Sequence, residues 1–158
     1  MTTSSTRKVS FAVTLCNLMI YGLLSSQPLA VAAPKAATLA IGTKASELMF
    51  DKVKLTAKPG QTVKLTFTNK AAKDSGMQHN WVLVNPGKVD EVGQAAMAAG
   101  PDKGYIPDSK DILAHTKLLN AGDKDTIEFT APAQAGDYPY LCTFPGHYTM
   151  MKGVFSVK

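Results

Sequence analysis

The chain has 158 residues, a formal net charge of +5 and 18% charged residues, which suits one domain large enough for a substantial core. A hydrophobic content of 45% argues against a disordered chain. Its lysines are spread at strand spacing and are not clustered with aromatic residues, so the composition also argues against a nucleic-acid-binding protein.

The first segment of the chain has the pattern of a secretory signal peptide. Two basic residues precede an apolar run over 11–24, and a small-residue segment over 30–33 follows that run. We expect cleavage after Ala32, so that residues 1–32 are removed and residues 33–158 form the mature domain. A retained membrane anchor is the alternative. Export would place the mature protein in the periplasm or outside the cell.

Removal of this segment changes the charge and the cysteine count. Two of the 17 basic residues leave with it, and the formal charge of the mature chain falls to +3. Cys16 leaves as well, so Cys142 stands alone and no intramolecular disulfide can form. A lone thiol in an exported protein, which meets an oxidising compartment, needs a separate explanation.

The middle of the chain alternates between apolar and polar residues with the period of a β-strand. Val53, Leu55 and Ala57 alternate with lysine and threonine, which predicts a half-buried strand with these three on its inner face. Pro59 and Gly60 then supply the two central residues of a type II turn, and a second alternating strand follows.

Eight such runs and one helical segment predict the fold. The strand-like runs cover residues 37–41, 52–58, 62–68, 79–84, 112–118, 126–129, 138–142 and 153–157. Apolar residues recur at helical spacing between Lys88 and Ala99, and Gly100 and Pro101 end that segment. The sequence therefore predicts an all-β protein, a β-sandwich of about eight strands with one short helix.

The residues that carry chemistry begin near the C-terminus. Cys142, His147 and Met151 fall within ten residues, between the end of one predicted strand and the start of the next. Pro145 and Gly146 bend this segment. A thiolate, an imidazole and a thioether can therefore surround one point.

A second imidazole comes from far upstream, where His79 begins an apolar strand. Two histidines, one cysteine and a weak methionine suit copper that cycles between Cu(II) and Cu(I). Taken alone, each residue has a simpler interpretation, since a lone cysteine is usually a small buried hydrophobe and a methionine usually fills a core. Together they favour one copper ion bound by His79, Cys142, His147 and Met151.

Three segments resemble azurin and the related auracyanins, which are blue (type 1) copper proteins of the cupredoxin family. They are Gly-Met-x-His-Asn-Trp-Val-Leu around His79, Ala-His-Thr-Lys-Leu around His115, and Cys-Thr-Phe-Pro-Gly-His-x-x-x-Met-Lys-Gly from Cys142. The likeness covers roughly residues 37–158. It implies a Greek-key cupredoxin sandwich that carries single electrons between proteins, with Met151 as the axial ligand.

The resemblance also implies contacts around the metal. Azurins place a backbone carbonyl opposite the axial methionine, from the residue before the first histidine, which is Gln78 here instead of the usual glycine. Asn80 would tie the two ligand segments together, and the backbone amide of Phe144 would point toward the sulfur of Cys142. An apolar patch around His147 would briefly dock redox proteins such as cytochromes or copper oxidoreductases.

Other functions stay open at this point. A copper storage or delivery protein would use similar ligands in an open site. A thiol enzyme would use Cys142 as a nucleophile activated by His147, but it would leave His79 and Met151 without roles. A zinc site would be atypical with a methionine ligand. We interpret His115 as a surface or packing residue, and we expect no enzyme because no carboxylate is placed to act as a general base.

Overall fold

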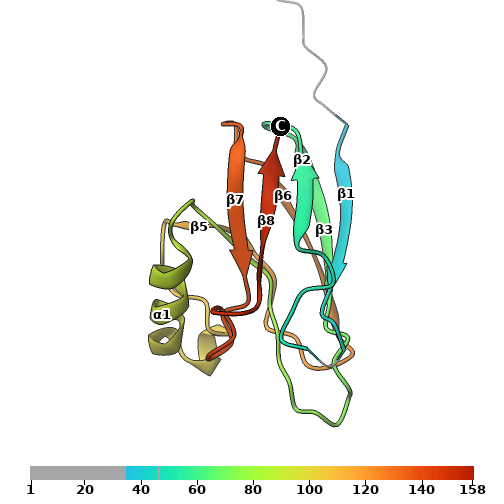
Figure 1. Cartoon of the computed structure of the whole chain (residues 1–158), viewed down its shortest axis with the longest axis vertical. Coiled ribbons are helices and arrows are strands. Elements are labelled where there is room, and N and C mark those ends of the chain that lie inside the picture. Colours follow the sequence, from blue (N-terminus) through green and yellow to red (C-terminus); the bar gives the residue numbers. More distant parts are fainter. Residues whose placement is uncertain (1–34, 46) are drawn as a thin grey trace, which may run out of the picture. The chain divides into compact units, whose positions relative to one another are not determined.

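The computed structural model describes residues 35–45 and 47–158, in which eight strands form two sheets (Figure 1). The strands are β1 (Ala37–Gly42), β2 (Lys54–Ala57), β3 (Thr62–Thr68), β4 (Val82–Val84), β5 (Ile112–His115), β6 (Lys124–Thr130), β7 (Gly136–Leu141) and β8 (Lys152–Val157). One α-helix, α1 (Val89–Ala99), and a short 3-10 helix, η1 (Pro101–Lys103), follow β4. The predicted signal peptide, residues 1–32, lies outside the described residues.

The strand order explains how distant segments meet. One sheet has the order β1-β3-β6, and the other has the order β2-β8-β7-β4-β5. β1 runs parallel to β3 and β2 runs parallel to β8, whereas the other neighbours are antiparallel. Val82 at the start of β4 pairs with Leu141 at the end of β7. The segment before β4 and the segment after β7 therefore meet at the same end of the five-stranded sheet.

The predicted all-β sandwich with eight strands and one helix is confirmed, with differences at the ends of elements. The expected burial of Val53 is wrong: this side chain is 57% exposed because β2 begins only at Lys54. The turn at Pro59 and Gly60 is present, with φ of 66° at Gly60. It joins β2 and β3, which belong to different sheets, so the chain crosses the sandwich there.

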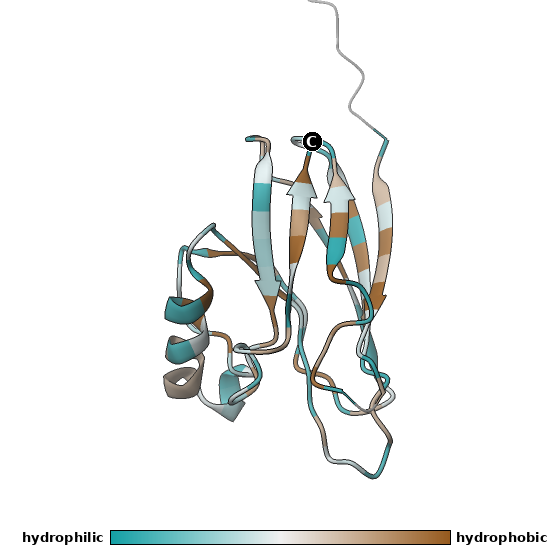
Figure 2. Cartoon of the chain, viewed as in Figure 1, coloured by the Kyte–Doolittle hydropathy of each residue, from teal (hydrophilic) through white to brown (hydrophobic). Residues whose placement is uncertain are grey.

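The core lies between the two sheets and is rich in aromatic side chains. Trp81, Tyr140 and Phe67 are fully buried, and the ring centroids of Trp81 and Tyr140 are 5.6 Å apart. Hydropathy alternates along β2 and β3 because one face meets the core and the other meets solvent (Figure 2). Cys142 and Met151 belong to the same core, so the candidate site is continuous with the packed interior.

Helix α1 packs on the five-stranded sheet. Val92 of the helix is buried in a second cluster with Val82, Val84 and Leu141, which come from β4 and β7. This cluster is separate from the core between the sheets. Among the described residues, no helix has the length and apolar character needed to cross a membrane.

Candidate metal centre

Three potential ligand atoms converge at the end of the five-stranded sheet. Sγ of Cys142 lies 3.8 Å from Nδ1 of His79 and 3.7 Å from Nδ1 of His147, and all three residues offer ligand atoms within 4.8 Å of one another. A point between atoms so spaced lies roughly 2.2–2.4 Å from each, close to metal–thiolate and metal–imidazole bond lengths. The exposed fractions of Cys142, His79 and His147 are 0, 2 and 5%. The cluster therefore fits one metal ion enclosed by protein.

Backbone hydrogen bonds position these side chains. His79 lies before β4 in an isolated bridge with Leu119, whose carbonyl accepts the His79 amide at 3.1 Å and whose amide donates back at 2.8 Å. Cys142 directly follows β7, and its amide donates to the Met151 carbonyl at 3.0 Å. The Met151 amide donates to the His147 carbonyl at 2.7 Å. The segment from Cys142 to Met151 is thus a closed turn in which the side chains of Cys142, His147 and Met151 are buried.

The two methionines at the end of this segment have opposite environments. Met151 is fully buried in the same core as Cys142, whereas 65% of Met150 is exposed. This difference favours Met151 as the fourth ligand. The side-chain amide of Gln78 donates to Oδ1 of Asn120 at 2.8 Å, and a contact from the Gln78 backbone carbonyl to the metal stays a prediction.

Asn80 joins the two ligand segments, as the resemblance implied. Its Oδ1 accepts the Thr143 amide at 2.8 Å, and its Nδ2 donates to Oγ1 of Thr143 at 2.7 Å. Nδ2 also donates to the Gly104 carbonyl at 3.2 Å. The bond to Gly104 was not predicted, and nothing in the sequence around this glycine marks it. Asn80 therefore fixes three separate stretches of chain around the site.

The sulfur of Cys142 accepts backbone hydrogen bonds from both Asn80 and Phe144. The contact from Phe144 confirms the expectation, and the contact from Asn80 is an addition to it. Burial raises the pKa of the Cys142 thiol to about 11, although the two hydrogen bonds oppose the shift. The thiol is therefore protonated at neutral pH in the metal-free protein, and metal binding must release that proton.

The two imidazoles are neutral in the metal-free protein at neutral pH. Burial, and to a lesser degree the neighbouring His147, lowers the pKa of His79 from 6.5 to about 4. Burial also lowers the pKa of His147. A neutral imidazole has one ring nitrogen with a free lone pair, so both histidines can bind a metal ion.

The match to known proteins agrees with this donor set. A family model described as copper binding proteins of the plastocyanin/azurin family matches residues 37–158, a range that contains the whole cluster. This chain belongs to the plastocyanin/azurin family. Its cofactor is copper, and members of this cupredoxin family generally transfer electrons.

Individual cupredoxins are similar over most of the chain. Auracyanin-A of Chloroflexus aurantiacus is 44% identical over 124 residues, which are 77% of this chain and 74% of that protein. An azurin of Pseudomonas fluorescens biotype A is 41% identical over 100 residues, which are 61% and 77% of the two chains. The solved structure of auracyanin A from C. aurantiacus, a "blue" copper protein, has a TM-score of 0.72 at 42% identity, covering 78% of this chain and 99% of that chain. Dithionite-reduced auracyanin from Roseiflexus castenholzii has a TM-score of 0.71 at 40% identity, covering 77% and 97%.

The metal-free cupredoxin should lose stability as the pH falls from 6.5 to 4. His79 binds a proton near pH 6.5 when unfolded but only near pH 4 when folded, so protons favour the unfolded state in this window. The stability that the neutral imidazole contributes is complete above pH 6.5 and is lost as the pH falls through 4. We expect a loss of about 2–3 kcal/mol in the free energy of unfolding, measured with urea at pH 7 and pH 4. His79→Gln should lose the part of this dependence that comes from residue 79 and keep the part that comes from His147. A flat wild-type profile would contradict the prediction.

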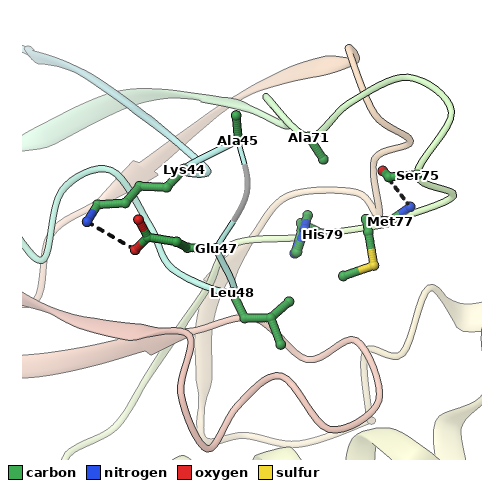
Figure 3. Close-up of a pocket in the computed structure, with 8 residues that line it drawn as sticks. All are labelled: Lys44, Ala45, Glu47, Leu48, Ala71, Ser75, Met77 and His79. Carbon is green, nitrogen blue, oxygen red and sulfur yellow. Dashed lines mark hydrogen bonds and ion pairs between the residues drawn. The ribbon is translucent and has the colours of Figure 1, made fainter.

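A hollow of about 320 Å³ borders the site on the side of His79 (Figure 3). Its lining residues are Lys44, Ala45, Glu47, Leu48, Ala71, Ser75, Met77 and His79. Figure 3 shows the side chains of His79 and Met77 next to each other, and the ion pair of Lys44 with Glu47, at 3.3 Å, on another part of the wall. Since only 2% of His79 is exposed, the hollow leaves this imidazole enclosed.

Two further residues from the sequence analysis lie outside the ligand cluster. His115 is exposed at the end of β5, and its Nδ1 lies 3.1 Å from the Thr116 carbonyl, so it is a surface residue as expected. Trp81, of the motif around His79, is fully buried in the core. Within the described part of the chain its Nε1 has no hydrogen-bond partner, which is uncommon for a buried indole.

Proposed function

We propose that this cupredoxin carries single electrons between redox proteins through one type 1 copper ion. The observation that supports this most directly is the enclosed group of Cys142, His79 and His147, with ligand atoms within 4.8 Å of one another. Two neutral imidazoles and one thiolate serve both oxidation states of copper. No position in this arrangement is left open for a substrate, so we infer an electron carrier and not an enzyme.

We propose that four residues would hold the copper: His79 and His147 through Nδ1, Cys142 through Sγ and Met151 through its thioether. The backbone carbonyl of Gln78 would add a fifth, weaker contact. When bound, copper supplies a one-electron Cu(II)/Cu(I) couple at this point. Met151 would contribute a soft, weak ligand from within the core, where its side chain is fully buried.

The protein supplies rigidity and a dry environment. The turn from Cys142 to Met151 is closed by backbone hydrogen bonds, and Asn80 fastens it to the segment of His79. Little movement of the ligands on gaining or losing an electron keeps the reorganisation energy of transfer low. Packed side chains exclude water from the site, which strengthens the hydrogen bonds to the Cys142 sulfur.

The thiol-enzyme alternative fits the site poorly. A nucleophilic cysteine needs a lowered thiol pKa and access to a substrate. Cys142 has a raised pKa and an exposed fraction of 0%. A storage or delivery protein would need rapid exchange of copper, so we expect slow loss of Cu(I) to a competing chelator. Loss within seconds would favour the delivery function.

The surface around His147 suits brief docking of redox partners. The ring of His147 lies against Phe144, with centroids 4.8 Å apart, and Phe144 is partly exposed. Met150, in the same loop as His147, is 65% exposed. Exposed apolar side chains of this kind mark small, weak interfaces. We propose that electrons enter and leave through His147, that the partners are cytochromes or copper oxidoreductases, and that the protein works in the periplasm or outside the cell.

A charge placed on this surface should slow electron transfer without altering the ligands of the copper site. We expect Met150→Lys to lower the rate of electron exchange between the Cu(I) and Cu(II) forms about tenfold or more, because the lysine must lose water when two apolar surfaces meet. Leu113→Lys is the matched control, since it adds the same charge at a leucine of β5 that is 37% exposed. Equal rates for the two variants, measured by NMR line broadening, would count against a docking surface at Met150.

A further inference from the structure

Gly93 occupies an unusual place, the buried interior of α1. An interior glycine makes a helix less stable than alanine does, because glycine loses more conformational freedom on folding. The residues that follow it, 95–99, include four alanines, so helix formation alone would favour alanine at this position too. The backbone at Gly93 is not among those with positive φ, so backbone conformation does not require glycine. The reason must be the space around it.

The side chain of Tyr148 occupies the space that a larger residue at Gly93 would need. A Cβ at this position would clash with Cγ, Cδ1 and Cδ2 of the tyrosine ring. Tyr148 also packs against the buried cluster that joins α1 to the sheet, including Val92 and Leu141. The ring therefore fits into a notch in the helix that exists only because residue 93 has no side chain.

The contact between Gly93 and Tyr148 lies one residue from the proposed metal ligand His147. Tyr148 directly follows His147, whose carbonyl accepts the Met151 amide at 2.7 Å. On the other side, the His147 amide donates to the Phe144 carbonyl at 3.0 Å. Figure 1 shows the loop between β7 and β8 next to α1. The loop is thus held by its own hydrogen bonds, and Tyr148 is its anchor on the helix side.

We propose that Gly93 and Tyr148 form a positioning contact that holds His147 at the copper site. Helix α1 contributes no ligand, yet it sets the place of the ligand loop through the fit of one aromatic ring against one glycine. Gly93 and Tyr148 do not touch the metal and act only through His147. The inference rests on the proposed copper ligation and is independent of the proposed role in electron transfer.

The first test measures thermal unfolding of the metal-free protein. The effect of Gly93→Ala on the unfolding midpoint should have opposite signs with and without the ring of Tyr148. In the wild-type background, Gly93→Ala should lower the midpoint of thermal unfolding, because the new methyl group displaces Tyr148. In a Tyr148→Ala background the same substitution should raise the midpoint by about 4 °C, since only helix propensity is then at work. Gln94→Ala, at the next and exposed position of α1, should act alike in both backgrounds. Stabilisation by Gly93→Ala in both backgrounds would overturn the proposal.

The second test uses the Cu(II)-loaded protein. Gly93→Ala and Tyr148→Ala should each shift the visible absorption bands and the reduction potential, because His147 moves relative to the metal. Tyr148→Phe keeps all ring atoms that contact Gly93 and should match the wild type. Adding Gly93→Ala to Tyr148→Ala should change the copper spectrum no further. A wild-type spectrum in both single alanine variants would overturn the positioning role.

The design separates this inference from the proposed function. If the wild-type protein itself lacks a thiolate–copper spectrum, the copper ligation is wrong, and the unfolding experiment still decides whether Tyr148 fills the notch. If the wild-type spectrum is that of type 1 copper and both Gly93→Ala and Tyr148→Ala leave it unchanged, only the positioning role is wrong. Should Gly93→Ala fail to fold, Tyr148→Ala and Tyr148→Phe carry the spectroscopic comparison.

Discussion

Met151→Ala should lower the free energy of unfolding of the metal-free protein by about 2–5 kcal/mol, the range for truncating a fully buried methionine. Met151 is 0% exposed and lies in the core that also holds Cys142. Its removal leaves a cavity whose walls are tied to the ligand turn by backbone hydrogen bonds, so the site cannot easily collapse. In the copper-loaded protein the same change should shift the reduction potential, because the weak soft ligand is lost.

The neighbouring methionine provides the control. Met150→Ala removes the same atoms one residue earlier, at a side chain that is 65% exposed, and should change stability by less than about 0.5 kcal/mol. Urea unfolding of the two metal-free variants and voltammetry of the two copper-loaded ones make the comparison. A shift in potential for Met150→Ala with none for Met151→Ala would refute the assignment of the axial ligand.

Asn80→Ala should be the second large effect, with a loss of about 2–5 kcal/mol in the free energy of unfolding. The substitution deprives the buried Thr143 amide of its acceptor and the buried Thr143 hydroxyl of a donor, and each buried polar group left without a partner costs about 1–3 kcal/mol. The partly buried Gly104 carbonyl loses a donor as well. It also removes the link between the His79 segment and the Cys142 segment. Copper affinity should fall with stability, because the ligands are then less well preorganised.

Asn85→Ala is a suitable comparison for Asn80→Ala. Asn85 lies just beyond the opposite end of β4, and its Nδ2 donates to Oδ1 of Asp111 at 3.0 Å, away from the ligand segments in sequence. Its loss should cost about 1 kcal/mol and leave the copper spectrum as it is. If the two variants lost equal stability and had equal copper affinities, Asn80 would be an ordinary buried residue with no special link to the site.

Much of the fold and the site could be predicted because the signals are local. The turn at Gly60 needs one glycine in a left-handed conformation, and the segment from Cys142 to Met151 concentrates three unusual ligands in ten residues. Alternation located the strands but not their ends. Val53 continues the apolar pattern of β2 and yet is exposed, because residue-by-residue pairing with β8 begins only at Lys54. The apolar pattern alone does not show where this pairing begins.

The contacts that could not be predicted are those between segments far apart in sequence. Asn80 bonds to the Gly104 carbonyl, 24 residues away, and any residue offers a carbonyl. The ring of Tyr148, in the ligand loop, fills the space beside Gly93. A glycine in a helix does not indicate in the sequence which side chain packs against it. Both contacts depend on which strands become neighbours, a property of the whole sandwich.

The most direct test of copper ligation by Cys142 is the visible spectrum of residues 33–158, the mature chain that we predict, loaded with Cu(II), together with its low-temperature electron paramagnetic resonance. Cys142→Ser is the control. We predict an intense blue band that disappears on reduction and is missing from the control, with a narrow copper hyperfine splitting. A pale spectrum of ordinary Cu(II), equal in both proteins, would contradict thiolate ligation and with it the proposed electron carrier.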